Sequence, residues 1–184
     1  MKLAQSYSNL EDTMMKLVIS STAALALTSL TLSAFADDGD PGMLAPIDLS
    51  SPEATAHSMM RAMYQGDANM VDQVFAPDAQ LRRITSEGEL RPDGLQRWRD
   101  WVGTLAVGDA HEELFGVTSE TFGKLATVWA PFTITYQGEM VGCGINQLSM
   151  AQIDESWRVV FGMDTNAPKE SCDTFKDDYL ASLD

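Results

Sequence analysis

The hydrophobic positions of the chain repeat with a helical period in its first half and alternate like β-strands in its second half. Ser51 and Pro52 suit the N-cap and the first turn of a helix, and Gly66 suits its end. Between them, apolar residues recur at the spacing i, i+3, i+4 and i+7: Ala56, Met59, Met60 and Met63. This spacing predicts a helix with one buried face.

Two further helices are predicted after Gly66. Asp67 suits the N-cap of a short helix whose buried side contains Met70, Val71 and Val74. Asp93 suits the N-cap of a longer one with Leu95, Trp98, Val102 and Leu105 on a shared face. Between the two helices, residues 76–78 (APD) predict a turn, and the alternation over residues 79–85 predicts a strand.

From Ala110 onward the chain consists of long runs rich in β-branched and aromatic residues. The runs cover residues 111–120, 124–136, 139–153 and 156–165, and short breaks (TFG, QG and DE) separate them. Such breaks are typical of β-hairpins. Helices followed by an antiparallel meander indicate an α+β fold.

Counting from these turns predicts which strand residues face one another. A turn at Gln137-Gly138 places Phe132 opposite Cys143 and Trp129 opposite Asn146. Together with the turn at Asp154-Glu155, this register assigns one sheet face to Trp129, Asn146, Leu148, Met150, Val159, Phe161 and Met163. The other face receives Val128, Ala130, Phe132, Cys143, Ile145, Val160 and Asp164. A shift of one residue would exchange the faces.

Both predicted faces are apolar, so the face away from the helices needs a cover of its own. A second subunit or the C-terminal tail, residues 167–184, could provide it. The sequence leaves this choice open and makes a homodimer through the sheet the expected assembly.

The first 36 residues resemble a secretory signal peptide. Lys16 precedes an apolar run over residues 17–32, and Ala34-Phe35-Ala36 forms a small-residue cleavage site. A membrane anchor is the less favoured alternative. Acidic residues precede Lys16, so we expect translation to start at Met14 or Met15. Residues 37–50, rich in Gly, Pro and Asp, are expected to form a flexible leader. The expected location is periplasmic or secreted.

The charge balance limits the choice of partners. The chain has 12 Lys and Arg against 27 Asp and Glu, which gives a net charge of −15. Such a chain repels nucleic acid phosphates, and no segment after the signal peptide is apolar enough to enter a membrane. With only two cysteines and two histidines, we expect no metal site and no cofactor.

Cys143, which lies between two glycines, has several possible roles. In an oxidising compartment a disulfide with Cys172 is favoured, and a free, buried small residue is the alternative. A nucleophilic role is disfavoured because the sequence shows no Cys–His–Asn or Cys–His–Asp pattern.

Several of these features together resemble the nuclear transport factor 2-like superfamily, which includes SnoaL-like and ketosteroid-isomerase-like proteins. The features are a helix, a GD pair, a short helix, FAPDA, a strand, a helix, and a sheet that ends in WRVV from Trp157. The resemblance covers roughly residues 52–165. It implies a cone-shaped α+β barrel over residues 51–166, with three N-terminal helices packed on a strongly curved antiparallel sheet. It also implies a pocket at the open end and dimers through the sheet.

At the position of the isomerase base this chain departs from the pattern. In ketosteroid isomerases an Asp lies five residues after the Asp of the turn, and counting from Asp78 gives Arg83 here. A guanidinium cannot abstract a proton at neutral pH. Arg83 could hold a carboxylate or phosphate in the cavity, but pairing with a nearby acid is favoured.

Other polar residues remain candidates for chemistry or binding. His111, Tyr64 and Asp164 are candidate acids or bases, although His111 and Tyr64 also suit surface and packing roles. Asn146 could bind a ligand or satisfy the backbone at a bulge near Gly142 and Gly144. The expected ligand pocket is formed by Arg83, Trp129, Asn146, Phe161 and Tyr64.

The sequence favours an exported small-molecule-binding or accessory protein with an apolar pocket and no assured catalytic activity. A ligand could be apolar or carry an anionic group near Arg83. One alternative is a SnoaL-like lyase or isomerase with a His, Tyr or Asp acid–base pair. Another is a structural module that binds proteins through its sheet.

Overall fold

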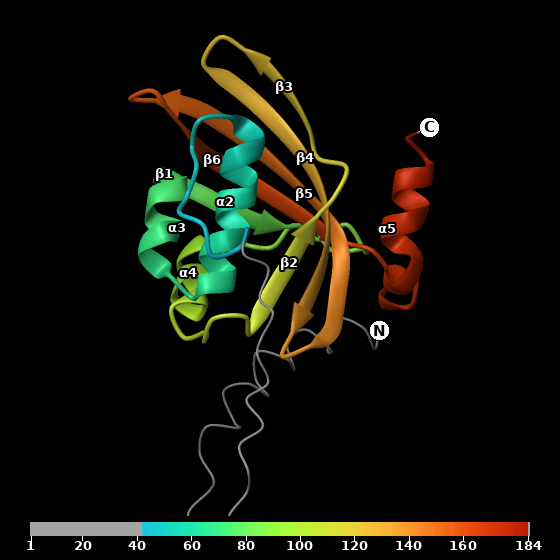
Figure 1. Ribbon diagram of the computed structural model, residues 1–184. Helices are drawn as coiled ribbons and strands as arrows, with labels where there is room; N and C mark the ends of the chain where they lie inside the picture. Colours follow the sequence, from blue (N-terminus) through green and yellow to red (C-terminus); the bar gives the residue numbers. More distant parts are fainter. Residues whose placement is uncertain (1–41, 184) are drawn as a thin grey trace, which may run out of the picture. The chain divides into compact units, whose positions relative to one another are not determined.

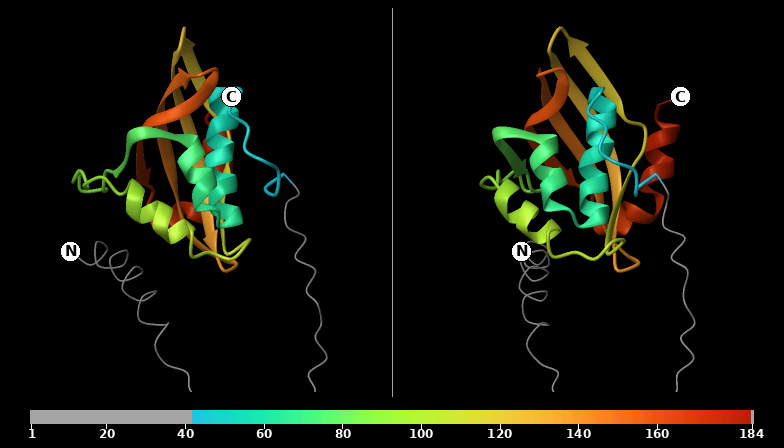
Figure 2. Two further views of the ribbon diagram at one scale, coloured as in Figure 1. Left: turned by 90° about the vertical axis from the view of Figure 1, so that its left-hand side faces the viewer. Right: turned by 60° about the vertical axis from the view of Figure 1, so that its left-hand side comes forward.

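Three helices lie against one face of a curved sheet, and a fourth lies against the other face (Figures 1 and 2). The structure is a computed structural model that describes residues 42–183, so the predicted signal peptide lies outside the described residues. The helices are α2 (Pro52–Gln65), α3 (Ala68–Val74), α4 (Leu95–Val102) and α5 (Cys172–Ala181), with a 3₁₀ turn η1 (Lys169–Ser171). The strands are β1 (Phe75–Arg83), β2 (Ala110–Leu114), β3 (Thr118–Phe122), β4 (Leu125–Tyr136), β5 (Glu139–Ile153) and β6 (Ser156–Asn166).

The predicted helix ends are largely confirmed. The Ser51 hydroxyl accepts a hydrogen bond from the Ala54 N–H, and Gly66 ends α2 in the left-handed conformation. The Asp67 carboxylate caps α3. Helix α4 begins one residue later than expected, with Gly94 as N-cap, although the Asp93 carboxylate still accepts from the Leu95 N–H.

The sheet order is β1-β6-β5-β4-β2, and β3 also pairs with β4. The α+β class is confirmed, but the sheet is mixed, because β1 runs parallel to β6. Our expectation of a wholly antiparallel sheet is therefore wrong at this edge. More than 70 residues separate β1 from β6, so no turn between them shows the direction in which β1 runs.

Two strand boundaries differ from the prediction. Residues 76–78, expected as a turn, lie within β1, where Asp78 has a φ of 61° and the pairing with β6 shifts. The run 111–120 forms two strands and not one, because residues 115–117 are not part of a strand. Strand β2 then pairs with the second half of β4, and β3 pairs with the first half.

Two β-bulges shift the predicted register by one residue. Thr135 pairs with Met140 but Ile134 pairs with Gly142, so Val141 is the extra residue and Trp129 faces Gln147 rather than Asn146. A second bulge at Val160 shifts the pairing between β5 and β6. Each bulge adds a residue to one strand only, so counting from the turn fails beyond it.

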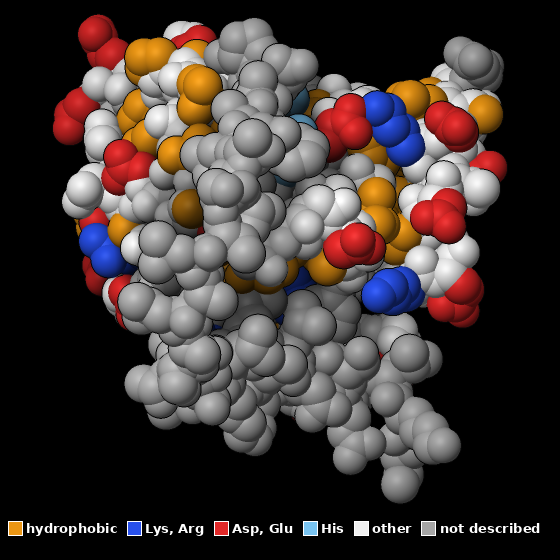
Figure 3. Space-filling view, turned by 60° about the horizontal axis from the view of Figure 1, so that its bottom comes forward, with side chains coloured by type: hydrophobic (Ala, Val, Ile, Leu, Met, Phe, Trp, Pro, Cys, Tyr) orange, Lys and Arg blue, Asp and Glu red, His pale blue; other side chains and the backbone are white. Residues whose placement is uncertain are grey.

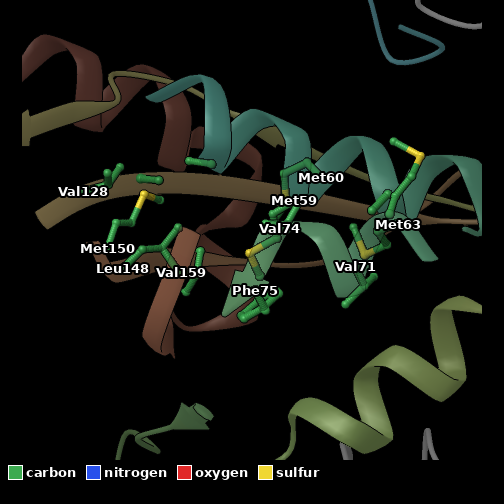
Figure 4. Close-up of a cluster of buried hydrophobic side chains, with 14 of the residues drawn as sticks. Met59, Met60, Met63, Val71, Val74, Phe75, Val128, Leu148, Met150 and Val159 are labelled. Atoms are coloured by element: carbon green, nitrogen blue, oxygen red, sulfur yellow. The ribbon is translucent and has the colours of Figure 1, made fainter. Parts of the chain in front are cut away.

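The core lies between α2, α3 and the sheet face that they cover, which we call the inner face. Met59, Met63, Val71 and Val74 from the helices meet strand residues that include Val128, Leu148, Met150 and Val159 (Figure 4). Gly162 also lies on this face, where an added Cβ would lie 2.7 Å from Leu81 and 3.2 Å from Leu148. Both contacts are with the tips of Leu side chains, so a larger residue at this position requires those side chains to shift.

Residues 42–50, expected to form part of a flexible leader, instead run along α2. The Gln65 side chain donates to the carbonyls of Met43 and Ala45, and the Ser58 hydroxyl exchanges hydrogen bonds with the Asp48 backbone. Met43, Ile47 and Leu49 pack against the core. The apolar residues within the Gly- and Pro-rich stretch account for this contact.

Part of the opposite sheet face, the outer face, is covered by the C-terminal tail. Cys172, at the start of α5, forms a disulfide with Cys143 of β5. Phe175 and Tyr179 pack edge-on against Phe115, with ring centroids 5.9 and 6.1 Å apart. The sequence allowed either a second subunit or the C-terminal tail as the cover of this face. The structure shows that the tail covers part of it.

On the side of the molecule shown in Figure 3, Asp and Glu side chains are scattered among hydrophobic and other residues, with fewer Lys or Arg. Among residues 42–183, no helix has the length and hydropathy needed to cross a bilayer.

Candidate functional site

A row of polar side chains crosses the inner face of the sheet. Arg83 on β1 pairs with Asp164 on β6, and Asp164 pairs in turn with Asn146 on β5. Glu112 lies between Ala110 and Leu114 on β2, and both of these contact the core, so alternation places Glu112 on the same face. Four strands thus contribute one polar residue each to an otherwise apolar wall.

Glu112 and Asn146 are hydrogen-bonded to each other. The Asn146 Nδ2 donates to Glu112 Oε1 at 2.7 Å, although β4 separates their two strands. Asn146 is only 6% exposed. A buried amide needs partners, and the Glu112 carboxyl group provides one that the sequence did not suggest.

The surroundings of Glu112 make it easy to protonate near neutral pH. Burial raises its pKa to about 7, because a charged carboxylate loses hydration there. The hydrogen bond from Asn146 acts in the opposite direction, the charge of Asp164 raises the pKa, and the charge of Arg83 lowers it. A group with such a pKa exchanges its proton at physiological pH.

Arg83 and Asp164 form an ion pair at the other end of the row. The Arg83 Nε donates to both carboxylate oxygens of Asp164 at 2.9 and 3.0 Å, and Nη2 also contacts Oδ2. The Asp164 side chain is 13% exposed and that of Arg83 is 41% exposed. The favoured expectation, that Arg83 pairs with an acid, agrees with this geometry, and the guanidinium faces a carboxylate of the chain itself.

His111 and Tyr64 contact each other, whereas Asp164 pairs with Arg83. Their rings meet edge to face with centroids 5.4 Å apart. Tyr64 is buried, and its backbone carbonyl accepts from the Gly108 N–H. The three candidate acids and bases from the sequence therefore form one aromatic pair and one separate ion pair.

Trp129 and Phe161 lie on the outer face, opposite Asn146. Trp129 pairs with Gln147 and Phe161 pairs with Ser149, and both partners alternate with inner residues of β5. Trp129 is 45% exposed and lines a shallow depression of about 220 Å³ together with Ile145 and Met163. The pocket predicted from the sequence is thus divided between two faces, and the shift of register is the reason.

Glu112 is not among the candidates that the sequence suggested. A signal for it exists: Ala110, Glu112 and Leu114 occupy alternate positions, and the outer two are apolar. A carboxylate between two apolar residues on one face of a strand is unusual, because burial of an unpaired charge is costly. This pattern favours Glu112 over His111 as the candidate acid or base of β2.

Comparison with known proteins supports the fold. No protein-family model and no curated protein sequence matches the chain. A protein of unknown function with a cystatin-like fold from Nostoc punctiforme has 15% identity and a TM-score of 0.51; the match covers 63% of this chain and 88% of that one. A nuclear transport factor 2-like protein of unknown function from Pseudomonas putida has 17% identity and a TM-score of 0.50, with coverages of 63% and 83%.

A third solved structure is a "putative dehydratase" of the nuclear transport factor 2-like family from Streptomyces avermitilis. It has 12% identity and a TM-score of 0.52, and the match covers 66% of this chain and 96% of that chain. At these identities the likeness concerns the fold and not the activity. The chain therefore has the nuclear transport factor 2-like fold that its sequence resembles.

Proposed function

We propose that the protein is an exported small-molecule-binding protein whose ligand lies against the inner face of the sheet. The observation that carries the proposal is the Glu112–Asn146 pair on an apolar wall. Ligand sites typically combine apolar walls with a few fixed polar groups that set orientation. Glu112 and Asn146 would contact the polar end of the ligand, and the apolar wall would contact its body.

The charges of the site favour a ligand without a strong negative charge. Asp164 already neutralises the Arg83 guanidinium, and Glu112 adds a further negative charge when it is ionised. An anionic group next to two carboxyl groups would be repelled. The proposed ligand is therefore a small, largely apolar molecule with a hydroxyl, carbonyl or amine group, and not the anion that the sequence allowed near Arg83.

Binding can be tested with the mature chain and a library of such molecules, by native mass spectrometry and thermal shift. We expect a bound compound to raise the melting temperature, and we expect Glu112→Gln and Asn146→Leu to weaken its binding. Trp129→Ala, on the outer face, is the matched control and should leave binding unchanged. If Trp129→Ala abolishes binding while both inner variants retain it, the proposed site is wrong.

A second candidate function is proton transfer in a lyase or isomerase reaction. The observation that favours it is the pKa of Glu112, about 7, which suits a general acid or base. Glu112 would carry the proton and Asn146 would orient its carboxyl group. Once a compound that binds is known, its turnover and its binding can be measured in the wild type and in Glu112→Gln. Loss of turnover with retained binding would show that Glu112 acts in catalysis and not in binding alone.

Export and dimerisation are part of the proposal. We expect the protein recovered from the periplasm to begin at Asp37, as N-terminal sequencing would show.

The exposed apolar part of the outer face, which includes Trp129, Ile145 and Met163, would form the contact between two copies. Analytical ultracentrifugation should then show a dimer that Trp129→Glu dissociates.

A further inference from the structure

Strand β2, which carries Glu112, is weakly held by the sheet. It has five residues, and in the described part of the chain it pairs with β4 alone. Asn146 lies on β5, on the far side of β4. The hydrogen bond from Asn146 to Glu112 therefore spans β4 on the inner face, and it forms only if β2 keeps its place at the sheet edge.

On the outer face, α5 holds the same strand and the residue that follows it. The Lys176 Nζ lies 2.5 Å from Glu113 Oε1, one residue after Glu112. Phe115 is 7% exposed and packs against Phe175 and Tyr179. A Cβ at Gly116 would approach Tyr179 within 3.1 Å, so the chain passes closely under the helix here.

The start of α5 is joined covalently to β5. Cys172 is bonded to Cys143, three residues before Asn146, and both cysteines are buried. We call the disulfide, the Lys176–Glu113 ion pair and the Phe115 contacts the outer bridge. The outer bridge and the Glu112–Asn146 bond thus connect β2 to β5 on opposite faces of β4.

We propose that the outer bridge is a positioning device for the site: α5, tied to β5 by the Cys143–Cys172 disulfide, holds β2 where Glu112 can bond to Asn146. Reduction by a thiol, which supplies two electrons and two protons and is itself oxidised to a disulfide, would convert the bond to two cysteine thiols. The inner site would then loosen, so its geometry would depend on the thiol–disulfide balance of the surroundings. This proposal rests on the proposed function only for its biological meaning, because the geometry of Glu112 can be measured without a ligand.

Hydrogen exchange provides the first test. In the variant Cys143→Ser/Cys172→Ser of the mature chain, and in reduced wild-type protein, the amides of β2 should exchange at least about tenfold faster than in the oxidised protein. The amides of β1, at the opposite edge of the sheet, should change far less. If β2 and β1 accelerate equally, the disulfide stabilises the whole fold and the positioning role is overturned.

The titration of Glu112 provides the second test, followed by NMR of the labelled carboxyl carbon. The groups that act on the pKa of Glu112 are Asn146 on β5, Asp164 on β6 and Arg83 on β1. The Lys176–Glu113 pair lies on the opposite face of β2. When the disulfide is removed, the midpoint should fall from about 7 toward the ordinary 4.5, because Glu112 becomes hydrated. An unchanged midpoint in a folded variant would overturn the proposal and leave the ligand-binding function intact.

A matched pair of single substitutions separates positioning from simple electrostatics and also serves if the double variant does not fold. Lys176→Met removes a positive charge and Glu113→Gln removes a negative one, so direct electrostatic effects on Glu112 would have opposite signs. Loosening of β2 lowers the midpoint in both, by a fraction of a pH unit because the ion pair is exposed. Opposite shifts would contradict the proposal. Phe122→Ala, at an 88% exposed position, is the control and should shift nothing.

Discussion

The two faces of the sheet differ in how they are stabilised, although the same strands form both. The inner face is covered by α2 and α3 and holds its residues by apolar packing. The outer face is partly covered by one short helix, α5. A disulfide and an aromatic cluster attach this helix to the sheet. Two residues of β5 show the contrast: Cys143 points outward to α5, and Asn146, three residues later, points inward to Glu112. Burial of the ionisable groups on the inner face costs free energy. The extensive apolar contacts around them offset that cost.

The largest expected effect is a loss of inner packing. Leu148 is 1% exposed and lies beneath the helices, so Leu148→Ala should lower the free energy of unfolding by about 2–5 kcal/mol. Trp129→Ala, on the outer face, should cost less than about 1 kcal/mol because the ring is half exposed. Denaturant unfolding measures both. If both substitutions lower the free energy of unfolding equally, the two faces do not differ in how they are stabilised.

The outer face should depend on its disulfide. Cys143→Ser/Cys172→Ser should lower the free energy of unfolding by about 2–4 kcal/mol, because the bond closes a loop with a separation of 29 residues. Unfolding with and without reductant measures it. The wild type should respond to reductant and the variant should not; a wild type that ignores reductant would contradict the prediction.

Protonation of Glu112 should affect stability in a defined pH window. Its pKa is about 7 in the folded protein and near 4.5 when hydrated, so the folded state binds the proton more tightly. Stability is unaffected below 4.5, falls as the pH rises from 4.5 to 7, and stays lowered above that. Glu112→Gln should therefore stabilise the fold by about 1–3 kcal/mol at pH 8 and by little at pH 4. An equal effect at both pH values would show that Glu112 has an ordinary pKa.

The smallest effect concerns the amide partner. Asn146→Leu removes a hydrogen bond that favours the ionised carboxylate, so the Glu112 pKa should rise above about 7. NMR titration of the carboxyl group measures this shift. Removal of the disulfide should move the same pKa down, so the two changes distinguish a lost partner from a displaced strand. A fall in Asn146→Leu would mean that the bond does not support the charged form.

Local signals determined much of the architecture. The caps at Ser51 and Asp67, the apolar stripe of α2 and the hairpin turns at Gln137-Gly138 and Asp154-Glu155 predicted helices and strands close to those observed. These signals act between residues near one another in sequence. The order of the helices and strands indicated the α+β class. The resemblance to the nuclear transport factor 2-like superfamily then implied the cone-shaped arrangement. It did not extend to the site, because Arg83 stands where the isomerase pattern has its base.

The tertiary structure alone decided the register, the edge pairing and the site. Bulges at Val141 and Val160 interrupt the alternation of their own strands and shift the pairing by one residue. Trp129 therefore lies on the outer face and Asn146 on the inner face, although the sequence predicted them on the same face. Burial of Glu112 depends on helices from the other half of the chain, and its pKa follows from that burial. The sequence by itself therefore determined the elements, since their causes are local. The fold decided which polar groups meet, since that depends on distant pairings that no short pattern encodes.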